Sequence, residues 1–111
     1  MPALIFVHIP LWEFETAWSQ RKTCFGTNDN GGITPTIHNT GLFAALEAAP
    51  EVEAVFVGHD HCNDFCCEFG ERAIDLCFGR HSGPSSPSRA SGWAARALNA
   101  TDPSRVTLSL R

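Results

Sequence analysis

Hydrophobic residues along the chain predict four β-strands. Residues 4–8 and 52–57 form short, nearly continuous apolar runs, which are typical of strands buried on both faces of a sheet. Residues 73–78 and 105–110 alternate between apolar and polar positions, as in strands with one buried face. A fully buried strand normally has neighbours on both sides, so a strand at residues 4–8 indicates that part of the domain lies upstream.

One helix is predicted between the first two strands. Thr40 is a suitable N-cap, apolar residues share one face over residues 41–49, and Pro50 ends the helix. Residues 19–39 are rich in turn-forming residues and show no hydrophobic period, which is typical of a long surface loop. Strand, loop, helix and strand are the parts of a crossover onto a parallel sheet, so the predicted fold class is α/β.

Composition limits the chain to one domain and excludes some classes of binding partner. With 111 residues and 43% hydrophobic content, the chain is long enough for one core. The net charge is −4 without a cluster of Lys or Arg, which argues against a nucleic-acid-binding surface. No apolar run approaches the roughly 20 residues of a membrane span. No basic residue precedes the first run, so we expect no signal peptide, and both the secretory pathway and the cytoplasm stay open. Residues 82–92 form a low-complexity loop rich in Ser, Pro and Gly.

Three histidines follow the ends of the first two predicted strands. His8 ends the first strand, and Gly58, His59, Asp60 and His61 follow the second. Ligand sites in open α/β sheets form at the carboxyl ends of strands, so we expect the three imidazoles to converge. The glycine allows a sharp turn that lets both rings of the pair point into one crevice. Because neutral imidazole is the commonest metal ligand, the sequence predicts a metal site at this edge of the sheet.

Four segments of the chain resemble, in order, the motifs of one enzyme family. Residues 6–14 and 55–65 are similar to the last two metal-binding motifs of the calcineurin-like metallophosphoesterases, in the purple-acid-phosphatase-like branch whose members read HIPL.E and GHDH.NDF. Residues 39–43 and 76–83 resemble the N-[ST]-G helix start and the LCYGRHTG block of the same family. The resemblance implies that residues 1–111 are the C-terminal half of one such domain, which is a layered sandwich of β-sheets flanked by helices.

The resemblance also implies a metal-dependent phosphoric-ester hydrolase. In this family two divalent or trivalent ions such as Fe, Zn or Mn activate a bridging hydroxide, which attacks the phosphorus of a phosphorylated substrate. By resemblance, His8 and His59 bind one ion and His61 binds the other. The family's earlier motifs, D-x-H, G-D-x-x-D and G-N-H-[DE], do not occur in the chain. Since each ion needs about four to six donors, we expect the chain alone to be inactive; the alternative is a non-catalytic metal-binding or interaction module.

Polar residues near the histidines are candidates for supporting roles. Asp60 is a candidate to orient a ligating ring through a hydrogen bond. The alternative interpretation is that it faces solvent in a turn. Asn63 and Asp64 are typical of a turn that bonds to its own backbone, and a ligand role is their alternative. Arg80 and His81 follow the third predicted strand. They are candidates to face a phosphate group or to support a metal ligand, and the alternative is that both are ordinary surface residues.

Three aromatic residues, Trp12, Phe14 and Trp18, follow His8 in the sequence. They either line a substrate pocket or belong to the core of the domain. His38 lies in the polar loop and is expected to be an ordinary exposed residue.

The chain contains five cysteines, an odd number that cannot all pair within it. Their spacing lacks the C-x2-C pairs of zinc ribbons, which makes structural zinc the weaker interpretation. A disulfide between Cys77 and either Cys66 or Cys67 is expected in a secreted protein, and buried free thiols are expected in a cytosolic one. The remaining two cysteines are Cys24 and Cys62.

Overall fold

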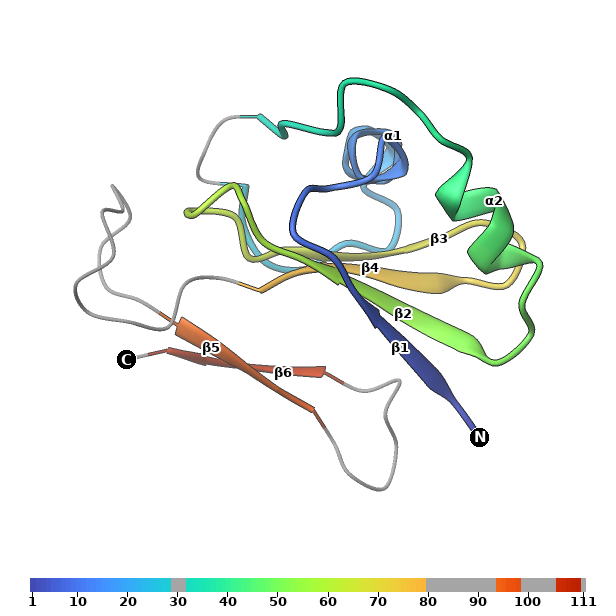
Figure 1. The fold of residues 1–111 in the computed structure, drawn as a ribbon. Coiled ribbons are helices and arrows are strands. Elements are labelled where there is room, and N and C mark those ends of the chain that lie inside the picture. The colour runs from blue at the N-terminus through green and yellow to red at the C-terminus, as the bar shows by residue number, and fades with distance from the viewer. Residues whose placement is uncertain (29–31, 80–93, 99–105, 111) are drawn as a thin grey trace.

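The fold is given by a computed structural model that describes residues 1–28, 32–79, 94–98 and 106–110 (Figure 1). Within these residues the helices are α1 (Glu13–Gln20) and α2 (Leu42–Glu47). The strands are β1 (Ala3–Phe6), β2 (Val52–Val57), β3 (Cys66–Phe69), β4 (Ile74–Phe78), β5 (Ala94–Leu98) and β6 (Val106–Leu110). In the described part of the chain, neither helix has the length and apolar character needed to cross a membrane.

A four-stranded sheet with the order β1-β2-β4-β3 forms the centre of the described fold. Strands β1, β2 and β4 run parallel, and β3 is antiparallel to β4. The connection from β1 to β2 carries α1 and α2, as expected for a crossover between parallel strands. Strands β5 and β6 form a separate antiparallel pair on the side of the sheet away from the helices (Figure 1). The α/β class is therefore confirmed, whereas the layered sandwich of the metallophosphoesterases stays a prediction.

The main core lies between the sheet and the helices. Val55 on β2 and Phe78 on β4 are fully buried there. Phe14 of α1 packs edge-to-face on Phe78, with ring centroids 5.4 Å apart, and Trp18 packs on Phe65 at 4.5 Å. Phe14 and Trp18 are one helical turn apart, so both rings lie on the sheet-facing side of α1, a helix that the hydrophobic pattern did not predict. These two aromatic residues therefore belong to the core.

The first strand is an edge strand of the described sheet, and the expectation that it is buried on both faces is wrong. Its first three residues are half-buried, and Phe6 is 66% exposed. β1 pairs with β2 on one side, and no described strand pairs with its other side. The Phe6 ring stacks on Phe56 of β2 with centroids 5.1 Å apart, and its other face is open.

The other predicted strands agree closely with the structure. β2 has the predicted bounds, and β4 and β6 each begin one residue later than predicted. Strands β3 and β5 were not predicted. The predicted low-complexity loop at residues 82–92 lies outside the described residues.

Helix α2 is shorter than predicted, and Thr40 is not its N-cap. Gly41 takes that position with φ 79°, in the left-handed region, and no side chain caps the helix. The other end is bound by Arg72, whose five N–H groups all donate to backbone oxygens at 2.7–3.1 Å. The acceptors belong to Leu46, Glu47, Ala49, Pro50 and Val52. One guanidinium group thus joins the end of α2, the following turn and the start of β2.

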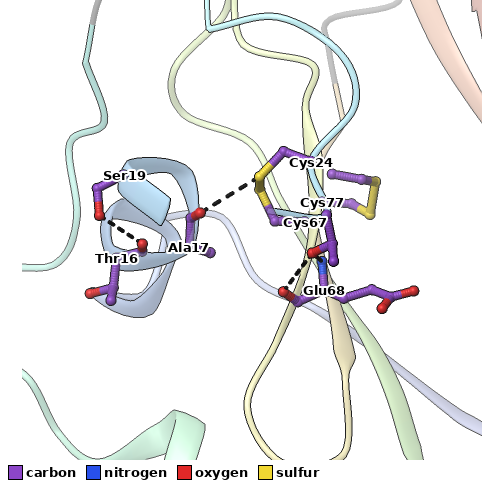
Figure 2. Close-up of a disulfide and its surroundings, with 9 residues drawn as sticks. Thr16, Ala17, Ser19, Cys24, Cys67, Glu68 and Cys77 are labelled. Atoms are coloured by element: carbon purple, nitrogen blue, oxygen red, sulfur yellow. Dashed lines mark hydrogen bonds between the residues drawn. A yellow bond between two sulfur atoms is a disulfide. The ribbon is translucent and has the colours of Figure 1, made fainter. Parts of the chain in front are cut away.

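Adjacent cysteines on β3 form two disulfides. Cys67 pairs with Cys24 in the loop after α1, and Cys66 pairs with Cys77 on β4 (Figure 2). Successive side chains of a strand point to opposite faces, so the two bridges lie on opposite faces of the sheet. Cys66–Cys77 is one of the two expected pairings, and Cys24–Cys67 was not predicted. Cys62 is buried outside the disulfides, so the structural-zinc interpretation is wrong.

Candidate functional site

The candidate site lies where the parallel strands β1 and β2 end side by side. Backbone pairing continues past both strands, since Val7 N donates to Phe56 O at 3.0 Å and Gly58 N donates to His8 O at 2.9 Å. This pairing sets His8 and His59 next to each other. Their imidazole rings meet edge-to-face, with centroids 5.3 Å apart and planes at 85°. Two of the three imidazoles that were expected to converge therefore meet, whereas no described group of three such side chains is arranged to hold an ion.

The turn after β2 is made by His59 itself. His59 has φ 72°, in the left-handed region that residues other than glycine seldom adopt. Gly58, expected to make this turn, has ordinary φ. It lies beneath the His8 ring, where an added Cβ would be 3.6 Å from His8 Nδ1. Uncommon backbone conformations of this kind are concentrated at functional sites.

Asp60 and His61 occupy opposite environments in the same turn. His61 is exposed, as are His8 and His59. Asp60 is buried, and its Oδ2 accepts a hydrogen bond from Thr34 N at 3.0 Å. The solvent-facing alternative for Asp60 is therefore wrong, and its carboxylate holds the loop between α1 and α2 against the histidine turn.

Asn63 and Asp64 bind the same loop. Asp64 Oδ1 accepts hydrogen bonds from Thr27 N at 2.7 Å and from Thr27 Oγ1 at 2.8 Å, and Asp64 N donates to Thr27 O at 3.0 Å. Asn63 Nδ2 donates to Gly32 O at 3.0 Å. Both side chains are buried, where polar groups need such partners. Their bonds reach across to a distant loop, beyond the local turn bonds that the sequence predicted.

The paired imidazoles fit part of a metal site. Ligating nitrogens lie about 2.1 Å from an ion such as Zn²⁺, and two rings in edge-to-face contact can turn nitrogens toward one ion. Among the residues that the structure describes, no group of three His, Cys, Asp or Glu side chains is arranged to hold an ion. The described residues therefore provide a ligand pair and no closed site. Arg80 and His81 lie outside the described residues.

Comparison with known proteins finds relatives that are named phosphatases. The chain is 38% identical over 96 residues to "Probable inactive purple acid phosphatase 29" of Arabidopsis thaliana, which covers 86% of this chain and 23% of the relative. It is 37% identical over 95 residues to "Probable inactive purple acid phosphatase 14" of the same plant, over 86% of this chain and 22% of the relative. It is 30% identical over 84 residues to "Phosphatase DCR2" of Saccharomyces cerevisiae, over 69% of this chain and 14% of the relative.

No family model matches the chain, and no solved structure matches it. The chain spans less than a quarter of the length of the curated relatives that it matches. The sequence likeness nevertheless extends over most of the chain. The chain is therefore related in sequence to proteins named purple acid phosphatases, the branch that its histidine motifs resemble.

Proposed function

We propose that this chain provides imidazole ligands to the metal site of a purple-acid-phosphatase-like phosphoesterase. One observation carries the proposal: His8 and His59 meet edge-to-face at 5.3 Å, at the carboxyl ends of two neighbouring parallel strands. That edge of an open α/β sheet is where ligands bind. His61 is exposed two residues further along the same turn and is the third proposed ligand.

The proposal assigns ligand roles to the three histidines and supporting roles to three polar residues of the turn. His8 and His59 hold one ion and His61 a second, with Fe, Zn or Mn as candidates because all accept imidazole. Bound ions would polarise a phosphoryl oxygen of a phosphorylated substrate and lower the pKa of a bound water. Asp60, Asn63 and Asp64 fix the turn that carries the imidazoles by anchoring it to the neighbouring loop.

We propose that the chain alone binds metal without turning over a phosphoric ester. An ion needs about four to six donors, and a two-metal site also needs carboxylates to offset the ionic charge. Three of the relatives carry "inactive" in their names, which favours a second candidate function, a non-catalytic metal-binding protein. Both candidate functions require a metal ion at the imidazoles. They differ in whether the whole protein hydrolyses a phosphoric ester.

The test is a Zn²⁺ titration of the chain followed by NMR of the histidine ring protons. We expect the His8 and His59 signals to shift together. Removal of either ligand by His8→Ala or His59→Ala should weaken binding by more than the roughly tenfold loss typical of changes around a metal site. His38→Ala, at an exposed histidine in the loop, is the matched control and should leave binding unchanged.

Two results would contradict the proposal. One is Zn²⁺ binding by His8→Ala that equals that of the unaltered chain. The other is metal-dependent hydrolysis of a phosphomonoester by the purified chain, since the imidazoles alone should not support turnover.

A further inference from the structure

A segment after α1, residues 23–28, lies antiparallel along residues 63–68. Phe25 N donates to Cys66 O at 2.9 Å, and Cys66 N donates to Phe25 O at 2.8 Å. The partner segment begins two residues after His61 and continues into β3. The segment 23–28, which we call the strap, therefore connects β3 with the turn that carries the candidate ligands.

The strap lies close against its partner segment on the side toward the histidine turn. Gly26 has φ 96°, and an added Cβ would lie 2.6 Å from Phe65 Cα, so the two backbones touch there. Thr27 joins Asp64 through its N–H, its hydroxyl and its backbone oxygen, at 2.7–3.0 Å. Asp64 follows His61 by three residues, so a displacement of the strap acts directly on the end of the histidine turn.

The disulfide Cys24–Cys67 joins the strap to β3 in the same register (Figure 2). Its Cα atoms are 4.1 Å apart, close to the spacing of directly opposite residues that share no backbone hydrogen bond. The strap is exposed to solvent except at Cys24 and Asn28, which are half-buried. Hydrogen bonds in such exposed segments open readily, so the covalent bond determines how firmly the strap is held.

The two disulfides differ in their access to solvent. Cys24 is half-buried in the exposed strap, whereas Cys66 and Cys77 are 2% and 0% exposed. A thiolate must reach a sulfur atom to exchange with a disulfide, so access determines which bond reacts first. Among the four paired cysteines, Cys24 is therefore the one open to attack.

We propose that Cys24–Cys67 is a redox switch that sets how firmly the strap holds the histidine turn. A thiolate of a dithiol reductant attacks Sγ of Cys24, the S–S bond breaks, and Cys67 leaves as a thiolate that takes up a proton. The second thiol of the reductant attacks the mixed disulfide, forms the reductant's own disulfide and releases Cys24. Two electrons pass from the dithiol to the protein, and the reverse exchange closes the bond again.

The first experiment measures which bond opens. The chain is incubated with increasing dithiothreitol, quenched with acid and labelled with iodoacetamide in denaturant, and mass spectrometry identifies the labelled cysteines. We expect Cys24 and Cys67 to be labelled at a dithiothreitol concentration at least tenfold lower than Cys66 and Cys77. Cys62 lies outside the disulfides and is the internal reference. Labelling of both pairs at one concentration would overturn the proposal.

The second experiment measures whether the histidine turn responds, by NMR of the His61 ring and the strap amides without metal. Opening of Cys24–Cys67 should shift both sets of signals while circular dichroism shows a folded chain. The variant with Cys24→Ser and Cys67→Ser is the matched control and should not respond to the same dithiothreitol. In Asp64→Ala the strap amides should still shift, whereas His61 should not. An unchanged His61 signal in the unaltered chain, or loss of the fold on opening, would overturn the switch.

The effect on metal binding rests on the proposed function and is measured separately. Opening the disulfide should weaken Zn²⁺ binding by about tenfold, the lower end of the losses seen when the support of a metal ligand is removed. If His61 responds to opening but Zn²⁺ binds in neither state, the proposed function is overturned and the switch stands. If Zn²⁺ binds equally in both states and His61 does not respond, the switch is overturned and the proposed function stands.

Discussion

The fold disfavours the negative charge of Asp75, so a substitution that removes this charge should stabilise the fold. Asp75 lies on β4 directly opposite Glu68 of β3, with Ala54 of β2 on its other side. Burial, followed by the charges of Glu68 and Glu53, raises the pKa of Asp75 from 3.8 to about 6. Arg72 and Asp75 line one cavity, but the N–H groups of Arg72 donate to backbone oxygens.

The sign of the pH dependence follows from this raised pKa. The folded chain binds the Asp75 proton more tightly than the unfolded chain, so the proton stabilises the fold at low pH. This stabilisation is complete below the unfolded pKa near 3.8 and is lost as pH rises through about 6. The fully ionised carboxylate therefore destabilises the fold at pH 7.5.

The expected size of the effect is about 1 kcal/mol. A shift from 3.8 to about 6 corresponds to about 3 kcal/mol if the whole difference acts on stability. The carboxyl group is only half-buried, and solvent screening reduces the interactions of such groups to about 1 kcal/mol. Asp75→Asn keeps the shape of the side chain and removes the charge. It should raise the free energy of unfolding by about 1 kcal/mol at pH 7.5 and change it little at pH 4.

Urea unfolding with intact disulfides, followed by circular dichroism between pH 4 and pH 8, measures this difference. Glu51→Gln is the matched control, because Glu51 is an exposed carboxylate in the turn before β2 and should give the same stability as the unaltered chain at each pH. Glu68→Gln should recover part of the gain, since it removes a neighbouring charge. A gain from Asp75→Asn that is equal at pH 4 and pH 7.5, or a loss at pH 7.5, would refute the reasoning.

Three further predictions concern the contacts that hold the fold around the site. Arg72→Lys should lower the free energy of unfolding by about 2 kcal/mol in urea, because an ammonium group cannot reach all the carbonyl oxygens that the guanidinium fork bonds. Replacing Cys24 and Cys67 together by Ser should lower stability by about 4 kcal/mol in thermal unfolding, because this disulfide closes a loop with a sequence separation of 43. Asp64→Ala should speed hydrogen exchange of the Thr27 amide by about tenfold or more, since that amide loses its carboxylate acceptor.

The ends of the two strands that carry the histidines were predictable, because a short apolar run in the local sequence determines where each strand lies. The apolar run at residues 52–57 fits a buried strand, and parallel neighbours end at the same edge of a sheet. His8 and His59 could therefore be expected to meet without knowledge of the loops between them. Which residue of the turn adopts the left-handed conformation was not predictable, because glycine was the favoured choice and His59 adopts it.

The elements that were missed depend on contacts with distant residues. Helix α1 has two buried residues, Phe14 and Ala17, and its remaining positions are largely polar or only partly covered. Its position is determined by packing against the aromatic side chains of the sheet and the loop before β3. Strand β3 is four residues long, and its first two residues are cysteines bound to two different segments. A window of sequence around either element contains none of these partners.

In the segment 59–64, burial distinguishes the candidate metal ligands from the residues that anchor the turn. The sequence alone does not make this distinction. His59 and His61 are exposed, whereas Asp60 and Asp64 are buried and accept backbone hydrogen bonds at 2.7–3.0 Å from the neighbouring loop. A carboxylate engaged in this way would give up its bonds to the loop if it turned toward an ion, and would release the turn that positions the imidazoles. If the histidines bind metal as proposed, the anionic donors to the ion would therefore come from residues other than Asp60 and Asp64.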